Sequence, residues 1–385
     1  MDFNYSQEQQ MLADTVERFV ADAYSMDERR RLATSERGFS EEHWQQFAEM
    51  GLLGLVVPEQ YGGLGSSALE TLIVMQALGR GLVLEPYWST AVVAARLLAV
   101  SGTGDQKARW LPAIVDGSSR VALATFEPEA RFDLPHIGSR ARRTSGGFVL
   151  NARKAVVLQA PSADALILSA RTGGDDTDRH GVSLFVIDAK ATGVTIESFP
   201  NIDGQRSAEV ALRDVAVGSD AVLGQVDAGF EPLEYAVDVG LAALCAEAVG
   251  CMEQLIAMTS EHLRGRRQFG RPIGTFQALQ HRVAEMAIAT EQARSAALLA
   301  AAHLDDGKLV SNRDGDRIGR RRAISAAKAT IGRSGRTVGQ HAVQLHGGMG
   351  MTDELAVGHY FKRLTCIDIT WGNSEHHTEL FGDFL

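Results

Sequence analysis

The chain has 385 residues, of which 45% are hydrophobic and 22% charged, as is ordinary for a folded globular protein. This composition excludes collagen, a coiled coil and disorder as descriptions of the whole chain. The 38 Lys and Arg against 48 Asp and Glu give a net charge of −10. That charge disfavours nucleic acid and anionic membranes as partners, because the bulk of the chain does not neutralise phosphate.

The cysteines and the N-terminus indicate a reducing compartment. Cys245, Cys251 and Cys366 form no CxxC pair and are too few for a disulfide framework, so we expect reduced core residues. The first ten residues, MDFNYSQEQQ, are too polar for a secretory signal, and no run of about 18 uncharged apolar residues predicts a transmembrane helix. We therefore expect a cytoplasmic protein without a membrane span.

Helical periodicity dominates the first 120 residues and returns after Gly229. The first group of helices is expected over 4–25, 40–50, 69–82, 89–100 and 103–116. Between about 121 and 223, the short runs VALATF, GFVLNA, AVVLQA, ADALILSA, VSLFVID and GVTIESF predict antiparallel strands. The second group of helices is expected over 233–263, 275–306, 317–348 and 354–363.

These elements predict an α+β multidomain fold: an N-terminal helical domain at 1–120, a middle antiparallel β-domain at 121–228 and a C-terminal helical bundle at 229–385. Three segments resemble the acyl-CoA dehydrogenase family, and the resemblance covers nearly the whole chain. They are VPEQYGGLG at 57–65, RRQFGRPIGTFQALQHRVAEM at 266–286 and QLHGGMGMTDELAVGHYFKR at 344–363.

The resemblance implies removal of two hydrogens from the Cα–Cβ bond of an acyl-CoA thioester. In that family a carboxylate takes the α-proton, and FAD accepts the β-hydride from the opposite side of the substrate. Each FAD is shared, because one subunit holds the flavin ring through its β-domain and another reaches across with its C-terminal domain to the adenosine and pyrophosphate.

The chain keeps two motifs of the C-terminal domain that, in the family, reach across to the FAD of a neighbouring subunit. We call them the reaching motifs. Arg266, Gln268 and Phe269 stand in the family's RxxFG pattern, where a guanidinium suits a diphosphate and a phenyl ring can pack on adenine. The alternative is an Arg that only stabilises a helix C-terminus.

The second kept motif is QxxGGxG, formed by Gln344, Gly347, Gly348 and Gly350. Its glycines allow close backbone approach to a cofactor, and its exposed N–H groups can donate to phosphate. The alternative is a helix-ending glycine turn.

The family's flavin-holding elements are altered. A TEPxxGSD-like loop is matched by TFEPEARFDLPHI at 125–137, where Arg131 and Phe132 replace Gly-Ser. The Trp-Ile-Thr strand aligns with Val156, Val157 and Leu158, so its aromatic ring and its hydroxyl are both lost. These losses put flavin binding by the chain's own β-domain in doubt.

The usual catalytic base is also missing. Its position is Trp371, and the alternative position used by some members is Gly240. Glu247 lies two helical turns beyond Gly240 on nearly the same face, among apolar neighbours that would raise its pKa, and is the candidate base. The alternative is a glutamate that pairs with an arginine or faces solvent.

We expect no metal site. His376 and His377 are adjacent, so on a helix their side chains point about 100° apart, and no further ligand has suitable spacing. They could instead approach the acyl-CoA or a partner interface, or be solvated near the C-terminus.

The chain keeps the reaching motifs and lacks the flavin-holding ones, so a homo-oligomer would have only defective sites. We therefore expect one of two unlike subunits of an FAD-dependent acyl-CoA dehydrogenase, resembling the α2β2 enzymes of bacterial steroid catabolism. An electron-transfer flavoprotein is the expected acceptor.

Three alternatives stay open at this point. The chain could be a self-sufficient homomeric dehydrogenase with Glu247 as base, or a non-catalytic scaffold or regulator with the same fold. A DNA-binding relative is disfavoured by the charge. The basic runs near Arg266 and at Arg320, Arg321 and Arg322 are more simply a phosphate contact and a solvated helix face.

Overall fold

The computed structural model describes residues 5–304 and 314–384. The segments before the sheet are helical: α1 (Gln7–Ala23), α2 (Met26–Thr34), α3 (Glu41–Glu49), η1 (Leu52–Gly54), η2 (Glu59–Tyr61), α4 (Ala68–Gly81), η3 (Trp88–Ala94), α5 (Ala95–Ser101) and α6 (Gly104–Val115). Reciprocal capping fixes several starts, since Ser6 and Thr103 each exchange hydrogen bonds with a Gln three residues later.

The middle of the chain forms one mixed sheet. Its elements are β1 (Val121–Ala124), β2 (Arg140–Thr144), β3 (Gly147–Leu158), η4 (Ala160–Ser162), β4 (Ala165–Arg171), β5 (Val182–Asp188), β6 (Val194–Pro200), β7 (Arg206–Gly218), η5 (Ser219–Ala221) and β8 (Val222–Leu223). The strand order is β6-β7-β3-β2-β4-β5-β8. Most neighbours are antiparallel, as expected, but β1 and β2 each pair with β4 in parallel.

The remaining elements form the C-terminal helical region: α7 (Phe230–Gly265), β9 (Arg267–Gln268), β10 (Arg271–Pro272), η6 (Ile273–Thr275), α8 (Gln277–Ala302), α9 (Asp314–His346), η7 (Gly347–Met351), α10 (Ala356–Ile369) and α11 (Ser374–Asp383). The helix α7 is central and crosses α4 closely. A Cβ on Gly79 would lie 2.2 Å from the carbonyl oxygen of Glu247, and one on Gly250 would lie 1.9 Å from that of Gln76, so both crossings require glycine.

The helix α7 is long and apolar enough to cross a bilayer by length and composition. However, 83% of its most apolar window is buried inside the protein. It is therefore better explained as the core helix of the domain, and by itself it is weak evidence for a membrane.

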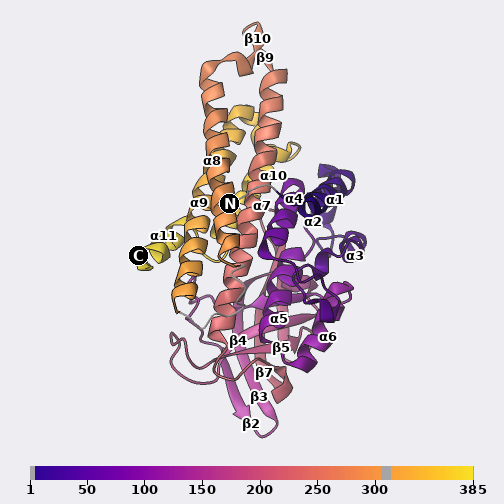
Figure 1. Cartoon of the computed structure of the whole chain (residues 1–385), viewed down its shortest axis with the longest axis vertical. Coiled ribbons are helices and arrows are strands. Elements are labelled where there is room, and N and C mark those ends of the chain that lie inside the picture. Colours follow the sequence, from indigo (N-terminus) through magenta and orange to yellow (C-terminus); the bar gives the residue numbers. More distant parts are fainter. Residues whose placement is uncertain (1–4, 305–313, 385) are drawn as a thin grey trace.

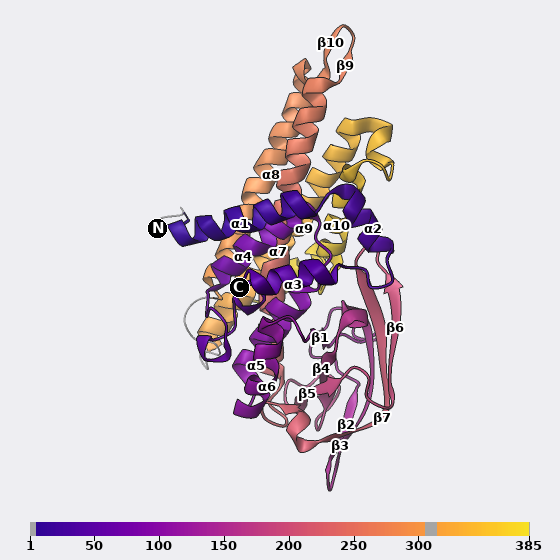
Figure 2. The same ribbon diagram turned by 90° about the vertical axis from the view of Figure 1, so that its right-hand side faces the viewer.

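The molecule is elongated, and its two ends differ in kind (Figures 1 and 2). The β9–β10 hairpin projects beyond the ends of α7 and α8 at one end, and the β2–β3 hairpin lies at the other. In the view of Figure 2, α1 and α2 lie above the sheet, whereas α5 and α6 lie beside it. The reaching motifs are thus far from the chain's own β-domain.

Candidate functional site

The two reaching motifs, distant in sequence, meet at one end of the molecule. The rings of His262, at the end of α7, and His346, at the end of α9, lie 4.4 Å apart. Burial, with His346 and Arg266 nearby, lowers the pKa of His262, so the ring pair is not a pair of cations at neutral pH. This contact joins the base of the RRQFG hairpin to the start of the GGMG turn.

The hairpin presents its side chains to solvent. Arg266 and Gln268 are exposed, and Phe269 is 89% exposed at a φ of 54°, a conformation that is uncommon for a phenylalanine. A guanidinium and a phenyl ring displayed in this way fit a diphosphate and an adenine ring. An exposed aromatic on a two-stranded tip is otherwise a solubility cost.

The glycines of the GGMG turn divide into two kinds. Gly347, at a φ of 64°, and Gly348 are exposed, and an added Cβ would meet nothing within 4 Å. Gly350 is buried, and a Cβ there would lie 2.8 Å from the carbonyl oxygen of Val343. Gly350 is therefore required by packing, whereas Gly348 has open space in front of it and Gln344 is exposed nearby in sequence.

The chain's own flavin-holding segments are built differently. Lys154, fully buried in β3, donates to the carboxylate of Glu127 at 2.6 Å and to the Thr125 carbonyl at 3.1 Å. Burial lowers the pKa of Lys154 to about 8, although Glu127 opposes the shift. Glu127 also accepts from the Ser139 hydroxyl at 2.6 Å, so the pair folds the 125–137 loop onto the sheet.

The strand that would contact a flavin ring offers no polar side chain. Val156 is 54% exposed at a φ of 49°, Val157 is buried, and Leu158 packs against the helical core. None of the three side chains can donate or accept a hydrogen bond. These residues do not fit a flavin ring.

The two positions where the resemblance places a base coincide in space. A Cβ on Gly240 would lie 2.6 Å from Cζ3 of Trp371, although 131 positions separate them in sequence. Neither residue is a carboxylate, so this place in the chain has no proton acceptor of the expected kind.

Glu247 is placed in an ion pair. Arg363 on α10 donates to both carboxylate oxygens of Glu247, from Nε at 2.6 Å and from Nη2 at 2.7 Å, and both residues are 5% exposed. Arg363 also donates from Nη1 to Asp203 at 2.8 Å. This is the arrangement expected of the structural alternative, in which Glu247 pairs with an arginine. Its role as a base remains a prediction.

Two of the three arginines in the basic run on α9 do not form a solvated face, contrary to that expectation. Arg320 and Arg321 are 8% and 9% exposed and donate to the two carboxylate oxygens of Asp238 at 2.8 and 2.7 Å. The reason is that α7 presents buried acids that these cations neutralise. The pair is therefore not available to a nucleic-acid backbone.

His376 and His377 lie at the start of α11 with their rings 5.3 Å apart. Burial lowers the pKa of both, that of His377 most strongly, and Nε2 of His377 is 3.2 Å from the Trp371 carbonyl oxygen, to which it donates. Within 5–304 and 314–384, no group of three His, Cys, Asp or Glu is arranged to hold a metal ion. The three cysteines are buried and free, as expected.

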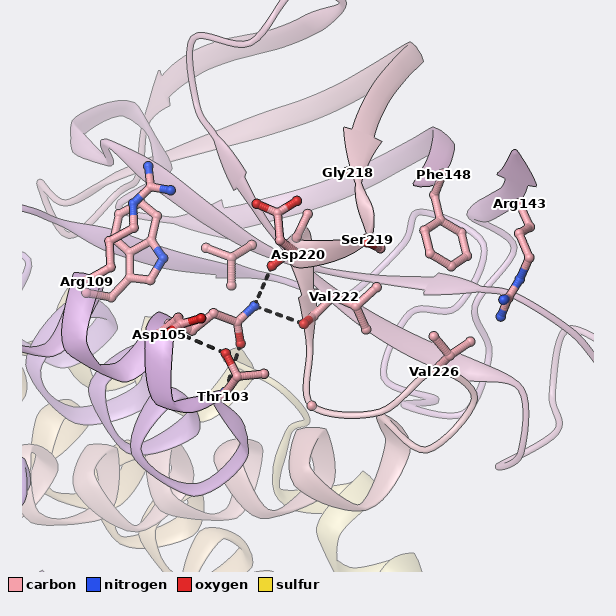
Figure 3. Close-up of a pocket in the computed structure, with 15 residues that line it drawn as sticks. Thr103, Asp105, Arg109, Arg143, Phe148, Gly218, Ser219, Asp220, Val222 and Val226 are labelled. Atoms are coloured by element: carbon pink, nitrogen blue, oxygen red, sulfur yellow. Dashed lines mark hydrogen bonds between the residues drawn. The ribbon is translucent and has the colours of Figure 1, made fainter. Parts of the chain in front are cut away.

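A cavity of about 620 Å³ lies between α6 and the sheet (Figure 3). Its floor is closed by Gln106, whose amide donates to the carbonyls of Asp220 and Val222 at 2.8 and 2.9 Å. It contains none of the motif residues. Its size alone therefore does not make it the candidate site.

Two residues with structural roles in the site were missed by sequence reasoning. Lys328, 0% exposed on α9, donates to the carbonyls of Asp368 and Gly372 at 2.7 Å each and so fixes the loop that carries Trp371. Arg363 was not recognised as the partner of Glu247. Both lie in helical patterns where a cation is normally taken for a surface residue, so no local signal distinguished them.

Comparison with known proteins agrees with this architecture. The acyl-CoA dehydrogenase N-terminal, middle and C-terminal domains match residues 6–118, 122–215 and 227–385. The mitochondrial isovaleryl-CoA dehydrogenase of Solanum tuberosum is 30% identical over 344 residues, which are 88% of this chain and 81% of that protein.

Three solved structures are similar throughout. A variant of the Tcur3481-Tcur3483 steroid ACAD has a TM-score of 0.87 at 30% identity, covering 98% of this chain and 97% of that one. The ChsE4-ChsE5 complex from Mycobacterium tuberculosis has a TM-score of 0.88 at 25% sequence identity, covering 100% of this chain and 98% of that one. The FAD complex of PigA gives 0.89 at 27%, also covering 100% and 98%. The expectation that the family uses FAD is thereby confirmed.

Proposed function

Because the chain belongs to the acyl-CoA dehydrogenase family, an oxidoreductase family that acts on acyl-CoA thioesters, we propose that it is one of two unlike subunits of such an enzyme. In the proposed assembly its C-terminal end completes an FAD site on a related partner subunit, in an α2β2 arrangement. The assembly oxidises the Cα–Cβ bond of an acyl-CoA and passes electrons to an electron-transfer flavoprotein.

The observation that carries the proposal is the placement of the reaching motifs. The β9–β10 hairpin lies at the end of the molecule opposite the β2–β3 hairpin (Figures 1 and 2), and the His262–His346 contact joins its base to the glycine turn. Arg266, Phe269 and Gly348 are exposed there, which supports a role in a site on another chain. The bound FAD supplies hydride acceptance. Arg266 would hold the diphosphate, Phe269 would pack on the adenine, and the N–H groups of the glycine turn would donate to phosphate.

The proposed substrate class rests on the comparisons with solved structures. One similar structure is titled a steroid ACAD and another is a complex of two differently named chains, which supports steroid or lipid acyl-CoA thioesters and a hetero-oligomer. No residue of this chain by itself defines the acyl group.

The first test is flavin stoichiometry, read from the visible spectrum against protein concentration. The chain expressed alone is expected to carry little FAD. Co-expression with a related subunit that retains the flavin-holding strand and the glutamate base is expected to give about half an FAD per chain. Near one FAD per chain from the protein alone would overturn the proposal and favour the homomeric enzyme with Glu247 as base.

The second test uses the open glycine. Gly348→Ala adds a methyl group into open space at an ordinary φ, so folding should not change while FAD retention in the complex falls. Gly104→Ala, which also meets nothing within 4 Å but lies on α6, is the matched control. Arg266→Gln should act like Gly348→Ala, and Arg264→Gln should have the smaller effect of a neighbouring charge. Full FAD retention in both the Gly348→Ala and Arg266→Gln complexes would contradict the shared site.

A further inference from the structure

Gly240 forms a notch in α7 that is filled by other side chains. Besides the 2.6 Å approach to Trp371, a Cβ at Gly240 would lie 3.1 Å from Cζ2 of Trp88 and 3.0 Å from Cγ2 of Val93. The indole N–H of Trp88 donates to the Gly240 carbonyl at 2.9 Å. The space that a side chain at Gly240 would need is therefore occupied by two indole rings.

Trp371 belongs to an aromatic cluster that spans the domains. Its ring centroid lies 4.6 Å from that of Trp88 on η3 and 5.9 Å from that of Phe126 at the end of β1. Phe126 is itself fixed, because its carbonyl accepts from the Ala155 N–H at 2.9 Å. We call Trp88, Phe126 and Trp371 the aromatic cluster.

The backbone around Trp371 is held on both sides. Trp371 has a φ of 54°, and its carbonyl accepts from His377. Lys328 donates to the carbonyls of Asp368 and Gly372, which flank Trp371. A bulky residue kept in the left-handed region needs such support, so the ring is positioned by its surroundings and does not swing freely.

The aromatic cluster joins the 125–137 loop to the 371–377 segment and so occupies space that a flavin and an acyl group would need. If a flavin ring and an acyl group were stacked between the 125–137 loop and the 371–377 segment, they would need about 7 Å, at about 3.5 Å for each van der Waals contact. Here the 125–137 loop and the 371–377 segment contact each other directly, through Phe126 with Trp371 and through Phe132 with His376, whose ring centroids are 5.5 Å apart.

We infer that Trp371 is an aromatic plug seated in the Gly240 notch, so that this chain's own place for flavin and acyl thioester is filled by protein. The inference deepens the proposed function and rests on it for the identity of the closed place. It also specifies Gly240 and Trp371 as a matched pair, in which the absence of one side chain makes room for the other. The indole of Trp371 contacts Trp88, Phe126 and the Gly240 backbone, and the residue is partly buried.

The test is a double-mutant cycle read as melting temperature of the full chain, alone or in its complex. Gly240→Ala should lower the melting temperature by several degrees, and the same change in a Trp371→Ala background should lower it much less, because the opposing ring is gone. Equal shifts in the two backgrounds would overturn the plug.

Two further readouts do not depend on how stable the variants are. Indole at millimolar concentration should raise the melting temperature of Trp371→Ala and leave the wild type unchanged, since it refills the hole. Circular dichroism should show an exciton signal from the Trp88–Trp371 pair that is lost in Trp371→Ala and kept in Trp110→Ala, because Trp110 packs against Arg109. An exciton signal that survives Trp371→Ala contradicts the cluster.

The failures of the two proposals are distinguishable. The shared FAD site is judged by flavin retention in the complex after changes at Gly348 and Arg266. The plug is judged by thermal coupling between Gly240 and Trp371 within this chain. A complex that holds FAD normally with no such coupling would remove the plug alone.

Discussion

Replacing Glu247 by glutamine separates a structural role from a catalytic one. In the structure this carboxylate neutralises Arg363 through two hydrogen bonds in a buried site. The carboxylates of Glu247 and Asp203 hold the pKa of Arg363 well above its usual value, although burial alone would lower it. Glu247→Gln leaves that guanidinium with one charged partner and turns an amide NH₂ toward a donor.

Removing one member of a buried pair typically costs about 3–5 kcal/mol of unfolding free energy. The lower figure applies here, because Asp203 still faces Arg363 and one amide oxygen still accepts. For a chain of this length a loss of about 3 kcal/mol corresponds to a melting temperature lower by about 4 °C. The assay is thermal unfolding, with Glu261→Gln, exposed on the same helix, as a control expected to stay within about 0.5 kcal/mol.

The partner variant completes the argument. Arg363→Met should be destabilising to a similar degree, and Glu247→Met combined with Arg363→Met should cost less than the sum of the two single changes, because Glu247 and Arg363 are removed together. Asp203 loses its Arg363 partner in both variants that carry Arg363→Met. A Glu247→Gln protein that melts like the wild type and yet loses dehydrogenase activity would refute this reasoning. It would restore Glu247 as the base of a homomeric enzyme.

Further consequences follow from other buried groups. Lys154→Met leaves the Glu127 carboxylate without its cation, so unfolding free energy should fall by about 3 kcal/mol, and combining it with Glu127→Gln should recover part of that loss in a denaturant titration. Burial lowers the pKa of Lys328 to about 8, so the folded state sheds this proton before the unfolded state does. The melting temperature of the wild type relative to Lys328→Met should therefore rise between about pH 8 and pH 10.4, and a flat difference would contradict the burial of this amine. Gly63→Ala should be severely destabilising in the same thermal assay, because its Cβ would lie 2.1 Å from the Val57 carbonyl oxygen, whereas Gly62→Ala, at a φ of 86° with open space, should cost only about 1 kcal/mol.

The strand pattern shows how far local sequence carries the fold. The runs GFVLNA and AVVLQA were expected as two strands, and they form the single strand β3, with Lys154 inside it. A lysine in the middle of a strand normally marks a break or an exposed edge. Here Glu127, which lies in a different loop, neutralises it, and no short-range pattern reports a partner 27 positions away.

The helix and the strand that the sequence did not predict were missed for the same reason. The helix α2 is mostly polar, yet Arg29 is buried in it beside Leu32 and donates to the carbonyls of Leu82 and Asp203. The strand β7 was not expected either, although it pairs with both β3 and β6. In each case the element is stabilised by contacts with distant segments, which periodicity along the chain cannot register.

In the candidate site, too, the sequence predicts some features and not others. Gapless counting from Gln344 and from Arg266 gave Trp371 and Gly240 as positions of a missing base, and the structure brings these two residues into contact. The two motif positions therefore point to one and the same place in the structure. The contents of that place, two further aromatic rings and a supporting lysine, depend on how three domains pack, and no motif describes them.

The proposal that this subunit does not hold its own flavin raises a packing question, which the aromatic cluster would answer. An empty space left by a lost ligand destabilises a protein by about 24 cal/mol for each Å³ that cannot collapse, so even a hollow of 150 Å³ would cost about 3.6 kcal/mol. The rings of Trp88, Phe126 and Trp371 would recover that energy as contact. The exposed end of the C-terminal helices has no such compensation, since Phe269, Met349 and Met351 are 89%, 59% and 72% exposed. Aromatic rings are thus in mutual contact at the aromatic cluster and exposed at the end of the C-terminal helices, which is the asymmetry that the proposal of a shared site expects.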